Sequence, residues 1–490
     1  MKHTDKEIVS DALALNYHLM HPGGDSAPGD PNVAFYLDGV YHLHYILRHL
    51  WQDKTSYSFV HVTSPDMIHW EWQPTKLQPS FTATGMFSGT GFITAEGKPA
   101  AIYAGLADPN QTYIAVAKDN QLSEWEKPYP IQPKGGPDGK DIPLIHDPDC
   151  FRIDDTYYAY SAADDVPLCK STDLINWIYV GPFMKHDMPD VAIGEDLSCA
   201  HFYPFGNQWM LLCISHMIGC RYYLGDWDAK NEQFVPHIHG RMNWRRPGQS
   251  LTDPTYRDFF APESVLTADG RRVMWSWLTT LDPEINLKSI QSLPRELSLH
   301  EDGSLNIQPL RELETLRHDE QIFNNLEVTS SDDLRISSDD LHIADIETDA
   351  FEVRVSMERA AADRRRFGFR LFADENSEGL LVLIRPETGT VCIGETEAPF
   401  SVANLPDGED LDLRIFVDKY LVEVFINGRQ AALTAHMTYK DEGKSLKAYA
   451  FFGRDNNPTR IKKLEIWKLK PTNQGFFEAK ENRIWAPEVN

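Results

Sequence analysis

The feature that most constrains the fold is a hairpin unit that recurs along the first part of the chain. Each copy pairs an apolar strand with a second strand across an Asp-, Gly- or Asn-containing turn, and the copies start about 50 to 65 residues apart. A repeat of this length with several strands is typical of a propeller blade. We therefore predict an all-β fold with a five-bladed β-propeller. The units begin with "FYLDGVYHLHY" at Phe35, "FITAEGKPAAIYAG" at Phe92, "FRIDDTYYAYSA" at Phe151, "FYPFGNQWMLLCIS" at Phe202 and "VLTADGRRVMWSWL" at Val265.

The pattern changes near Leu310. A charged segment, "LRELETLRHDEQ", has apolar residues at helical spacing, and alternating strands such as "AFEVRVSM" and "LVEVFING" follow it. Such strands separated by polar turns favour a β-sandwich. We expect four parts: the propeller in residues 1–308, a linker in 309–325, the sandwich in 326–470 and a C-terminal tail in 471–490. Phe476, Phe477 and Trp485 indicate that the tail packs back onto the protein.

Charge and composition exclude several functions. The formal net charge of -26 argues against nucleic acid, which needs clustered Lys and Arg. No run is long and apolar enough for a membrane span, and the N-terminus lacks the apolar core of a signal peptide. We expect a cytoplasmic protein, or a secreted one if the chain is a mature form. The six cysteines include no CxxC pair and are expected to be reduced. The oligomeric state stays open, a homo-oligomer included.

Three acids occupy similar places ahead of the apolar anchors of three units. Asp30 precedes the first unit in "GDPN", Asp147 the third in "HDPD", and Glu195 the fourth in "GEDLSCAHF". The innermost strands of a propeller line its central channel, so acids entering these strands would converge at one mouth. The other two units contribute hydroxyl and aromatic groups and Glu263. Such a mouth is typical of a sugar site.

Simpler interpretations exist for each acid taken alone. Asp before Pro commonly opens a turn, and Glu195-Asp196 would pass for a solvated surface pair. Three acids at equivalent positions of a repeat favour function, and crowding raises the pKa of at least one carboxyl, which suits acid catalysis. His42 and His44 alternate on one strand face, but without a third ligand nearby we interpret them as sheet surface or pocket lining rather than a metal site.

Several motifs, in this order, resemble those of family 32 glycoside hydrolases, the invertase, inulinase, levanase and fructosidase family. "GDPNVAFYLDGVYHLHY" resembles the family's W-[ML]-N-D-P-N-G box, "FSGTGF" its W-S-G-S segment, and "HDPDCF" its R-D-P box. "EDLSCAHFYPFGNQWMLLCIS" resembles the E-C box in a variant spacing. "APESVLTADGRRVMWSWL" and "SLPRELSL" resemble the end of the propeller, and "VEVFINGRQAALT" the sandwich. The likeness covers nearly the whole chain.

The resemblance implies a retaining β-fructofuranosidase that acts on sucrose, fructo-oligosaccharides or fructans without a metal or organic cofactor. It makes Asp30 the nucleophile, Glu195 the general acid/base and Asp147 the stabiliser of the transition state. Glu195 is preferred to the adjacent Asp196 because it has the family's residue type. The residues expected to contact the sugar are Asn32, Phe87, Ser88, His146, Glu263 and Trp277.

Departures from the family motifs leave specificity open. Ala27, Gly29 and Val33 stand where the first box has Trp, Asn and its final Gly, and His146 replaces the Arg of R-D-P. Three residues, Asp196 to Ser198, separate Glu195 from the Cys of the third box. Two alternatives therefore stay in view: an inverting five-bladed hydrolase of the arabinan or xylan type, and a non-catalytic sugar-binding protein on a degenerate hydrolase fold.

Overall fold

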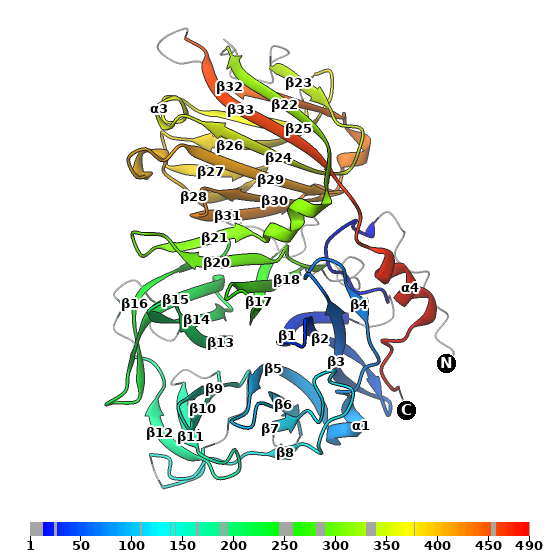
Figure 1. Cartoon of the computed structure of the whole chain (residues 1–490), viewed down its shortest axis with the longest axis vertical. Coiled ribbons are helices and arrows are strands. Elements are labelled where there is room, and N and C mark those ends of the chain that lie inside the picture. The colour runs from blue at the N-terminus through cyan, green and yellow to red at the C-terminus, as the bar shows by residue number, and fades with distance from the viewer. Residues whose placement is uncertain are drawn as a thin grey trace.

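Strands form most of both halves of the chain (Figure 1). The computed structural model describes residues 13–23, 27–107, 110–137, 139–142, 144–162, 166–185, 188, 191, 195–244, 258–280, 290–329, 340–376, 378–451 and 457–489. Within them, strands up to Pro309 form five separate antiparallel sheets, and later strands form two six-stranded sheets. The five sheets match the five repeated units in number and order.

The five sheets follow one another in sequence, and each begins with the strand that carries a predicted site segment. The first comprises β1 (Ala27–Leu37), β2 (Val40–Trp51), β3 (Lys54–Ser64) and β4 (Glu71–Trp72). The second comprises β5 (Gly85–Ile93), β6 (Pro99–Leu106), β7 (Gln111–Val116) and β8 (Tyr129–Pro130). The third comprises β9 (Asp149–Ile153), β10 (Thr156–Tyr160), β11 (Pro167–Ser171) and β12 (Ile178–Pro182). The fourth comprises β13 (Ser198–Phe205), β14 (Gln208–Ser215), β15 (Gly219–Asp228) and β16 (Gln233–Arg241). The fifth comprises β17 (Asp258–Leu266), β18 (Arg272–Thr279), β19 (Ile290–Gln291), β20 (Arg295–Leu299) and β21 (Leu305–Pro309).

The first strands of the five sheets contact one another in a cycle. β1 touches β5, β5 touches β9, β9 touches β13, β13 touches β17, and β17 touches β1. The hairpins that build the sheets have the turns their sequences predict: Asp38 and Gly39 both have positive φ, 48° and 87°, as a two-residue turn between twisted strands requires. The cyclic contacts bring the first strands of all five sheets together.

The C-terminal unit is a β-sandwich, as predicted. A short 3-10 helix, η2 (Arg311–Leu316), follows β21. Single helical turns in the C-terminal unit are α3 (Arg359–Ala362), η3 (Val402–Asn404) and η4 (Tyr439–Asp441), and another, α1 (Pro79–Thr82), lies earlier in the chain, before β5. One sheet comprises β22 (Arg317–Val328), β33 (Thr459–Leu469), β24 (Ala350–Met357), β29 (Leu411–Asp418), β30 (Leu421–Ile426) and β31 (Gln430–Ala435). The other comprises β23 (Leu341–Asp345), β32 (Ser445–Ala450), β25 (Phe367–Ala373), β26 (Leu380–Arg385), β27 (Thr390–Ile393) and β28 (Thr396–Pro399).

The linker is shorter than the sequence indicated. β22 begins at Arg317 and pairs with β33, so the second half of the expected linker 309–325 is sandwich strand. Its alternation is weak because most of its residues are half-exposed or exposed, and a polar strand carries little apolar periodicity. Only the η2 turn separates the last strand of the fifth sheet from the sandwich.

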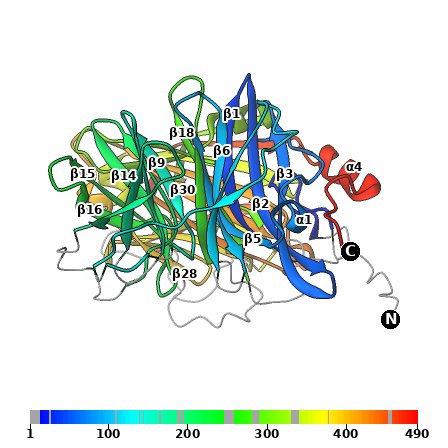
Figure 2. The same ribbon diagram turned by 90° about the horizontal axis from the view of Figure 1, so that it is seen from below.

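The C-terminal tail packs onto the first sheet. Helix α4 (Gln474–Asn482) contacts β4, and both views place it beside this sheet (Figures 1 and 2). Phe476 packs edge-on against Trp72, and Trp485 is 1% exposed. Phe477 is instead 43% exposed, so two of the three predicted aromatic anchors are buried.

A buried network of charges joins the sandwich to the fifth sheet and to the N-terminal segment. Arg295 on β20 donates to Glu423 on β30 at 3.1 Å, and both side chains are fully buried. His18 lies between Glu423 (3.4 Å) and Asp418 (2.8 Å). Burial lowers the pKa of His18, but its hydrogen bonds to the two carboxylates outweigh burial and raise the pKa to about 9. His18 is therefore a cation at neutral pH and ties three segments together.

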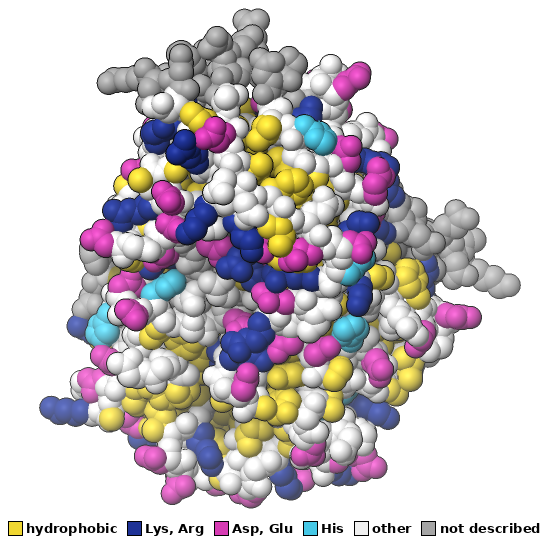
Figure 3. All heavy atoms as spheres, turned by 45° about the horizontal axis from the view of Figure 1, so that its top comes forward, with side chains coloured by type: hydrophobic (Ala, Val, Ile, Leu, Met, Phe, Trp, Pro, Cys, Tyr) yellow, Lys and Arg dark blue, Asp and Glu magenta, His cyan; other side chains and the backbone are white. Residues whose placement is uncertain are grey.

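The surface carries charges of both signs. On the face shown in Figure 3, acidic and basic side chains are interspersed. All six cysteines are free. Among the described residues, no helix has the length and apolar character needed to cross a membrane.

Loss of the His18 charge should weaken the protein at high pH. Because the folded-state pKa is raised, the stabilisation is complete below pH 6.5 and disappears as the pH rises through about 9. Between these limits the wild type should lose about 3 kcal/mol of unfolding free energy relative to His18→Gln. Denaturant unfolding at pH 6 and pH 9.5 measures this difference. The control is His69→Gln, since His69 is an exposed partner of Asp66; equal pH dependence in the wild type and both variants would contradict the expectation.

Candidate active site

Four of the five first strands are interrupted by β-bulges near the predicted site residues. A regular strand points successive side chains to opposite faces, whereas a bulge bends the strand and redirects them. Register shifts lie between Asn32 and Phe35 on β1, Phe87 and Gly89 on β5, Ser198 and His201 on β13, and Phe260 and Pro262 on β17.

Left-handed residues accompany these irregularities. Val33, Asp147, Cys199 and Ala261 have φ of 43°, 42°, 44° and 46°. A β-branched residue such as Val33 rarely adopts this conformation, which typically costs about 1–3 kcal/mol. The His44 ring holds the Val33 carbonyl through Nδ1 at 2.8 Å, and Val33 is fully buried. The turn after Asp30-Pro31-Asn32 is thus strained, and a hydrogen bond to His44 on the neighbouring strand β2 holds it in place.

Asp30 is buried at the start of this turn. Its Oδ2 accepts a hydrogen bond from Ser88 Oγ at 3.0 Å, and Cys199 Sγ lies 3.7 Å from the same oxygen. Asn32 Nδ2 donates to the Asp30 carbonyl at 2.8 Å, while Asn32 Oδ1 accepts from the Gly89 amide at 2.8 Å. The first two sheets therefore hold Asp30 jointly.

Asp147 lies in the same cluster. Its Oδ2 accepts from the Cys199 amide at 3.1 Å and from Cys199 Sγ at 3.6 Å. One thiol thus contacts two carboxylates from different sheets, and the three sheets that supply Asp30, Asp147 and Cys199 meet here. Asn32, Ser88, Asp147 and Cys199 line a small cavity at this point.

The environment of Asp30 favours its protonated form. Burial raises its pKa to about 6, and the nearby Asp147 charge adds to the rise, against the lowering effect of its hydrogen bonds with Ser88 and Cys199. A carboxyl with this pKa is ionised at neutral pH yet weakly solvated. That combination suits a carboxylate nucleophile, and shifted groups of this kind concentrate at functional sites.

Glu195 does not join this cluster through any hydrogen bond within the described part of the chain. Its carboxylate is paired with Arg221 on β15, and both side chains are buried. Asp196 has another partner, the His216 ring and amide at 2.6 and 3.0 Å. The two adjacent acids therefore have different partners. Ser198 occupies the position next to Cys199 on β13.

The other predicted contacts differ in their surroundings. Trp277 lies beside the first box, because a Cβ on Gly29 would be 3.9 Å from its ring, and its indole N–H has no hydrogen-bond partner among the described residues. Phe87 is half-buried and packs edge-on against Tyr57. His146 is exposed. Glu263 is 1% exposed and pairs with His201 at 2.7 Å.

Two buried features were not predicted. Asp149, two residues after Asp147, accepts from Thr90 Oγ1 at 2.5 Å, Tyr160 OH at 2.9 Å and the Phe202 amide at 2.8 Å, and so links the second, third and fourth sheets. In the sequence, only its place as the second acid of "HDPD" indicated that Asp149 belongs near the site.

The second feature is a stack of three histidines on β2 and β3, and it excludes one of the two interpretations given for His42 and His44. Both are buried rather than at the sheet surface, and both stack on His61, with ring centroids 5.1 and 4.4 Å away. Burial lowers the pKa of His42 to about 4 and that of His44 to about 3, so both rings are neutral. In the described part of the chain, no group of three or more His, Cys, Asp or Glu could hold a metal.

Comparison with known proteins agrees with this architecture. The N-terminal domain model of glycosyl hydrolases family 32 matches residues 26–309, and its C-terminal model matches residues 312–468. A raffinose invertase of Escherichia coli is 26% identical, over 89% of this chain and 92% of its own length. A levanase of Bacillus subtilis is 25% identical, over 90% of this chain and 68% of its own.

Solved structures share the fold. The sucrose-6-phosphate hydrolase of Lactobacillus gasseri has a TM-score of 0.68 at 19% identity, covering 96% of this chain and 98% of its own. The exo-inulinase of Aspergillus awamori has a TM-score of 0.71 at 18% identity, covering 96% and 100%. Since the two family models together span nearly the whole chain, the protein belongs to glycosyl hydrolase family 32, a family of retaining glycoside hydrolases.

The His44 contact should matter for activity through Val33. His44→Phe keeps a stacked ring but loses the hydrogen bond to the Val33 carbonyl, so the strained turn should relax and displace Asp30. We expect kcat to fall at least tenfold, about 1.4 kcal/mol in the barrier, with circular dichroism unchanged. Adding Val33→Gly should restore part of the loss, because glycine adopts positive φ without strain.

His42→Phe is the matched control, since His42 bonds His61 at 2.9 Å and not Val33. Equal losses in His42→Phe and His44→Phe, without rescue by Val33→Gly, would contradict a positioning role.

Proposed function

We propose that this protein is a β-fructofuranosidase that releases terminal β-D-fructofuranosyl residues from sucrose, fructo-oligosaccharides or fructans, with retention of configuration. The observation that carries the proposal is the meeting of Asp30 and Asp147 at the Cys199 thiol in a chain of this family. Family membership leaves the inverting arabinan or xylan alternative without support. The buried, pKa-shifted Asp30 likewise favours an enzyme over a non-catalytic binding protein.

The fold has a specific form in this proposal. The five sheets are blades of a β-propeller, with β1, β5, β9, β13 and β17 as inner strands around the channel; their cyclic contacts support this arrangement. Residues 1–308 form the catalytic domain, the η2 turn links it to the sandwich, and 471–490 form the tail. Free cysteines fit a reducing, cytoplasmic compartment.

Asp30 is the proposed nucleophile. Its ionised carboxylate attacks the anomeric carbon of the fructosyl unit, the glycosidic bond breaks, and a covalent fructosyl-enzyme forms. Asp147 accepts hydrogen bonds from fructosyl hydroxyls and its charge stabilises the oxocarbenium-like transition state. The Ser88 and Cys199 contacts hold the Asp30 oxygen in place before attack.

Glu195 is the proposed acid/base. In the ion pair with Arg221 it is a carboxylate, the form that takes a proton from water in the second half of the cycle. The first half needs a protonated carboxyl that donates to the leaving oxygen, so Arg221 has to release Glu195 as substrate binds. Leaving-group dependence is therefore the sharpest measure of this role.

Two of the proposed sugar contacts, Asn32 and Ser88, line the small cavity. Ser88 and Asn32 lie beside Asp30, and the Trp277 ring lies beside Gly29, where the first box lacks its Trp. Phe87, which precedes Ser88, and the exposed His146, which precedes Asp147, are further proposed contacts. Glu263 acts through the His201 ring that it binds.

A product profile tests the proposal. Purified protein is incubated with sucrose, inulin and levan, and the first product is followed by NMR. Release of fructose as the β-anomer before mutarotation is the expected result. The α-anomer would indicate inversion, and no release from any of the three substrates would overturn the enzyme assignment.

Asp30 should set the acidic limb of the pH profile. Because its pKa is about 6, kcat/KM should fall tenfold per pH unit below pH 6. Asp30→Asn should abolish turnover. At pH 7 it should also increase the unfolding free energy by roughly 3 kcal/mol, because ionising the buried carboxyl destabilises the folded state as pH rises from about 4 to 6. Near-normal turnover, or no stability gain, would refute this account of Asp30.

Glu195→Gln should depend on the leaving group. Turnover of sucrose should fall at least a hundredfold, while a fructoside with an acidic phenol leaving group should be affected much less in the fructosylation step. Asp196→Asn is the matched control and should retain most activity. The reverse pattern would move the acid role to Asp196.

A further inference from the structure

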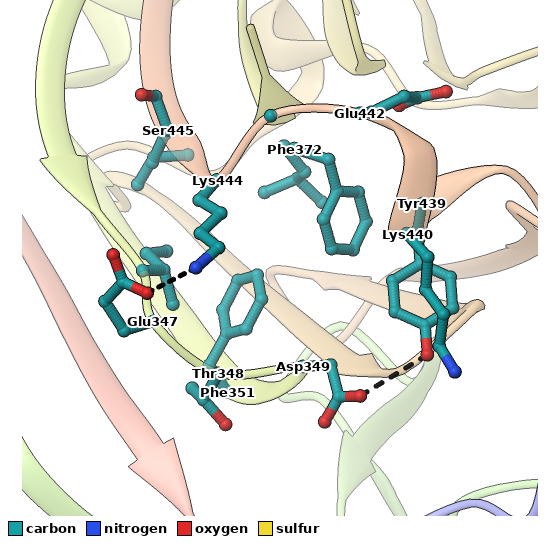
Figure 4. A pocket seen from close by; sticks show the side chains of 14 residues that line it. Glu347, Thr348, Asp349, Phe351, Phe372, Tyr439, Lys440, Glu442, Lys444 and Ser445 are labelled. Carbon is teal, nitrogen blue, oxygen red and sulfur yellow. Dashed lines mark hydrogen bonds and ion pairs between the residues drawn. The ribbon is translucent and has the colours of Figure 1, made fainter. Parts of the chain in front are cut away.

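The sandwich contains a second cavity, separate from the catalytic one. Its volume is about 460 Å³, within the range of about 300–1,000 Å³ typical of ligand sites. It lies between the segment joining β23 to β24, the end of β25 and the segment joining β31 to β32 (Figure 4). No residue lines both cavities.

Three aromatic rings form its apolar walls. Phe372 packs against Phe351 at 6.2 Å and against Tyr439 at 5.6 Å between ring centroids. Phe372 has a φ of 56°, in a bulge of β25 against β32 between Arg370 and Ala373. A bulky residue in this conformation is strained, and such strain is concentrated at ligand sites.

The loop opposite is fitted closely to this bulge. A Cβ on Gly443 would lie 2.0 Å from the Ala373 carbonyl oxygen, so only glycine allows the loop to approach. The close packing fixes the loop against the bulge that carries Phe372.

The polar groups of the cavity carry both charges. Lys444 pairs with Glu347 at 2.6 Å, and Asp349 accepts from Tyr439 OH at 3.3 Å (Figure 4). Asp349 also accepts from Asn16 Nδ2 at 3.2 Å, and Thr348 and Ser445 add hydroxyls at the edge. A site for an ion would present an excess of one sign, and a site for an apolar ligand would lack these groups. Aromatic faces beside hydroxyls, carboxylates and amines match a neutral polyol.

We propose that this cavity is a second sugar-binding site, which takes one neutral glycosyl unit and holds an oligomeric or polymeric substrate on the enzyme. The aromatic rings contact the C–H face of the sugar, and Asp349, Thr348 and Ser445 bond its hydroxyls. The choice of a fructosyl unit as ligand rests on the proposed function; the neutral sugar class rests on the cavity alone.

Filling the cavity tests the proposal. Thr348→Trp places a large ring at its edge, and Thr348→Val is the matched control that removes the hydroxyl without filling space. In the wild-type background, Thr348→Trp should raise KM for inulin or levan at least fivefold and leave kcat, and KM for sucrose, unchanged. Thr348→Val should change KM for the polymers by less than twofold. Unchanged polymer KM in Thr348→Trp would overturn the role in holding substrate.

Binding separates this inference from the proposed function. Calorimetric titration of Asp30→Asn with sucrose should detect two sites, and of Asp30→Asn/Thr348→Trp only one. If Thr348→Trp does not fold, Tyr439→Ala against Tyr439→Phe replaces it, with loss of the second site expected only for Ala. A single site in Asp30→Asn, with the cavity empty in a sucrose-soaked crystal, would overturn the inference even if fructosides are hydrolysed. Failure to hydrolyse fructosides would refute the proposed function and leave this measurement decisive.

Discussion

The bulges on the first strands of the sheets are the constraint on which the acid cluster depends. Asp30 and Cys199 belong to strands of different sheets, and regular strands would alternate their side chains between faces. The bulges of β1, β13 and β17 redirect their strands, with Val33, Cys199 and Ala261 in left-handed conformations. Val33, the most unfavourable of these residues, is held by complete burial and by His44. The strained conformation of Val33 is thus stabilised by its packing and by the neighbouring strand β2.

Hydrogen bonds between sheets make the position of each acid depend on its neighbours. Asn32 connects the first sheet to Gly89 of the second, and Asp149 connects the second, third and fourth. Both side chains are buried with their oxygens satisfied, and removing one partner would leave a buried polar group unpaired. The site is therefore a property of the packed sheets together rather than of one loop.

The sequence predicted those parts of the fold in which a residue pattern repeats along the chain. The five hairpin units and the convergence of Asp30 with Asp147 follow from residues that recur at equivalent places, and the sandwich strands follow from their alternation. The pairing of Glu195 with Arg221 could not be predicted, because it joins the approach to β13 with β15 and depends on the depth of both side chains. The extent of the linker was wrong because β22 is mostly polar, and the third histidine was missed because His61 lies on β3, a strand away from His42 and His44.

The departures from the family's first box are coupled to residues on other strands. Gly29 has no side chain, and the Trp277 ring of β18 occupies the adjacent space, so an aromatic face persists near Asp30 although Ala27 provides none. Val33 replaces a glycine at positive φ, and His44 of β2, stacked on His61 of β3, supports the strained carbonyl. In a site that had lost its function, we would expect no new support for the backbone at Val33 and no aromatic residue in place of the missing Trp. Residues on neighbouring strands therefore compensate for the altered positions of the first box. The effect of these positions on specificity has to be considered together with Trp277, His44 and His61.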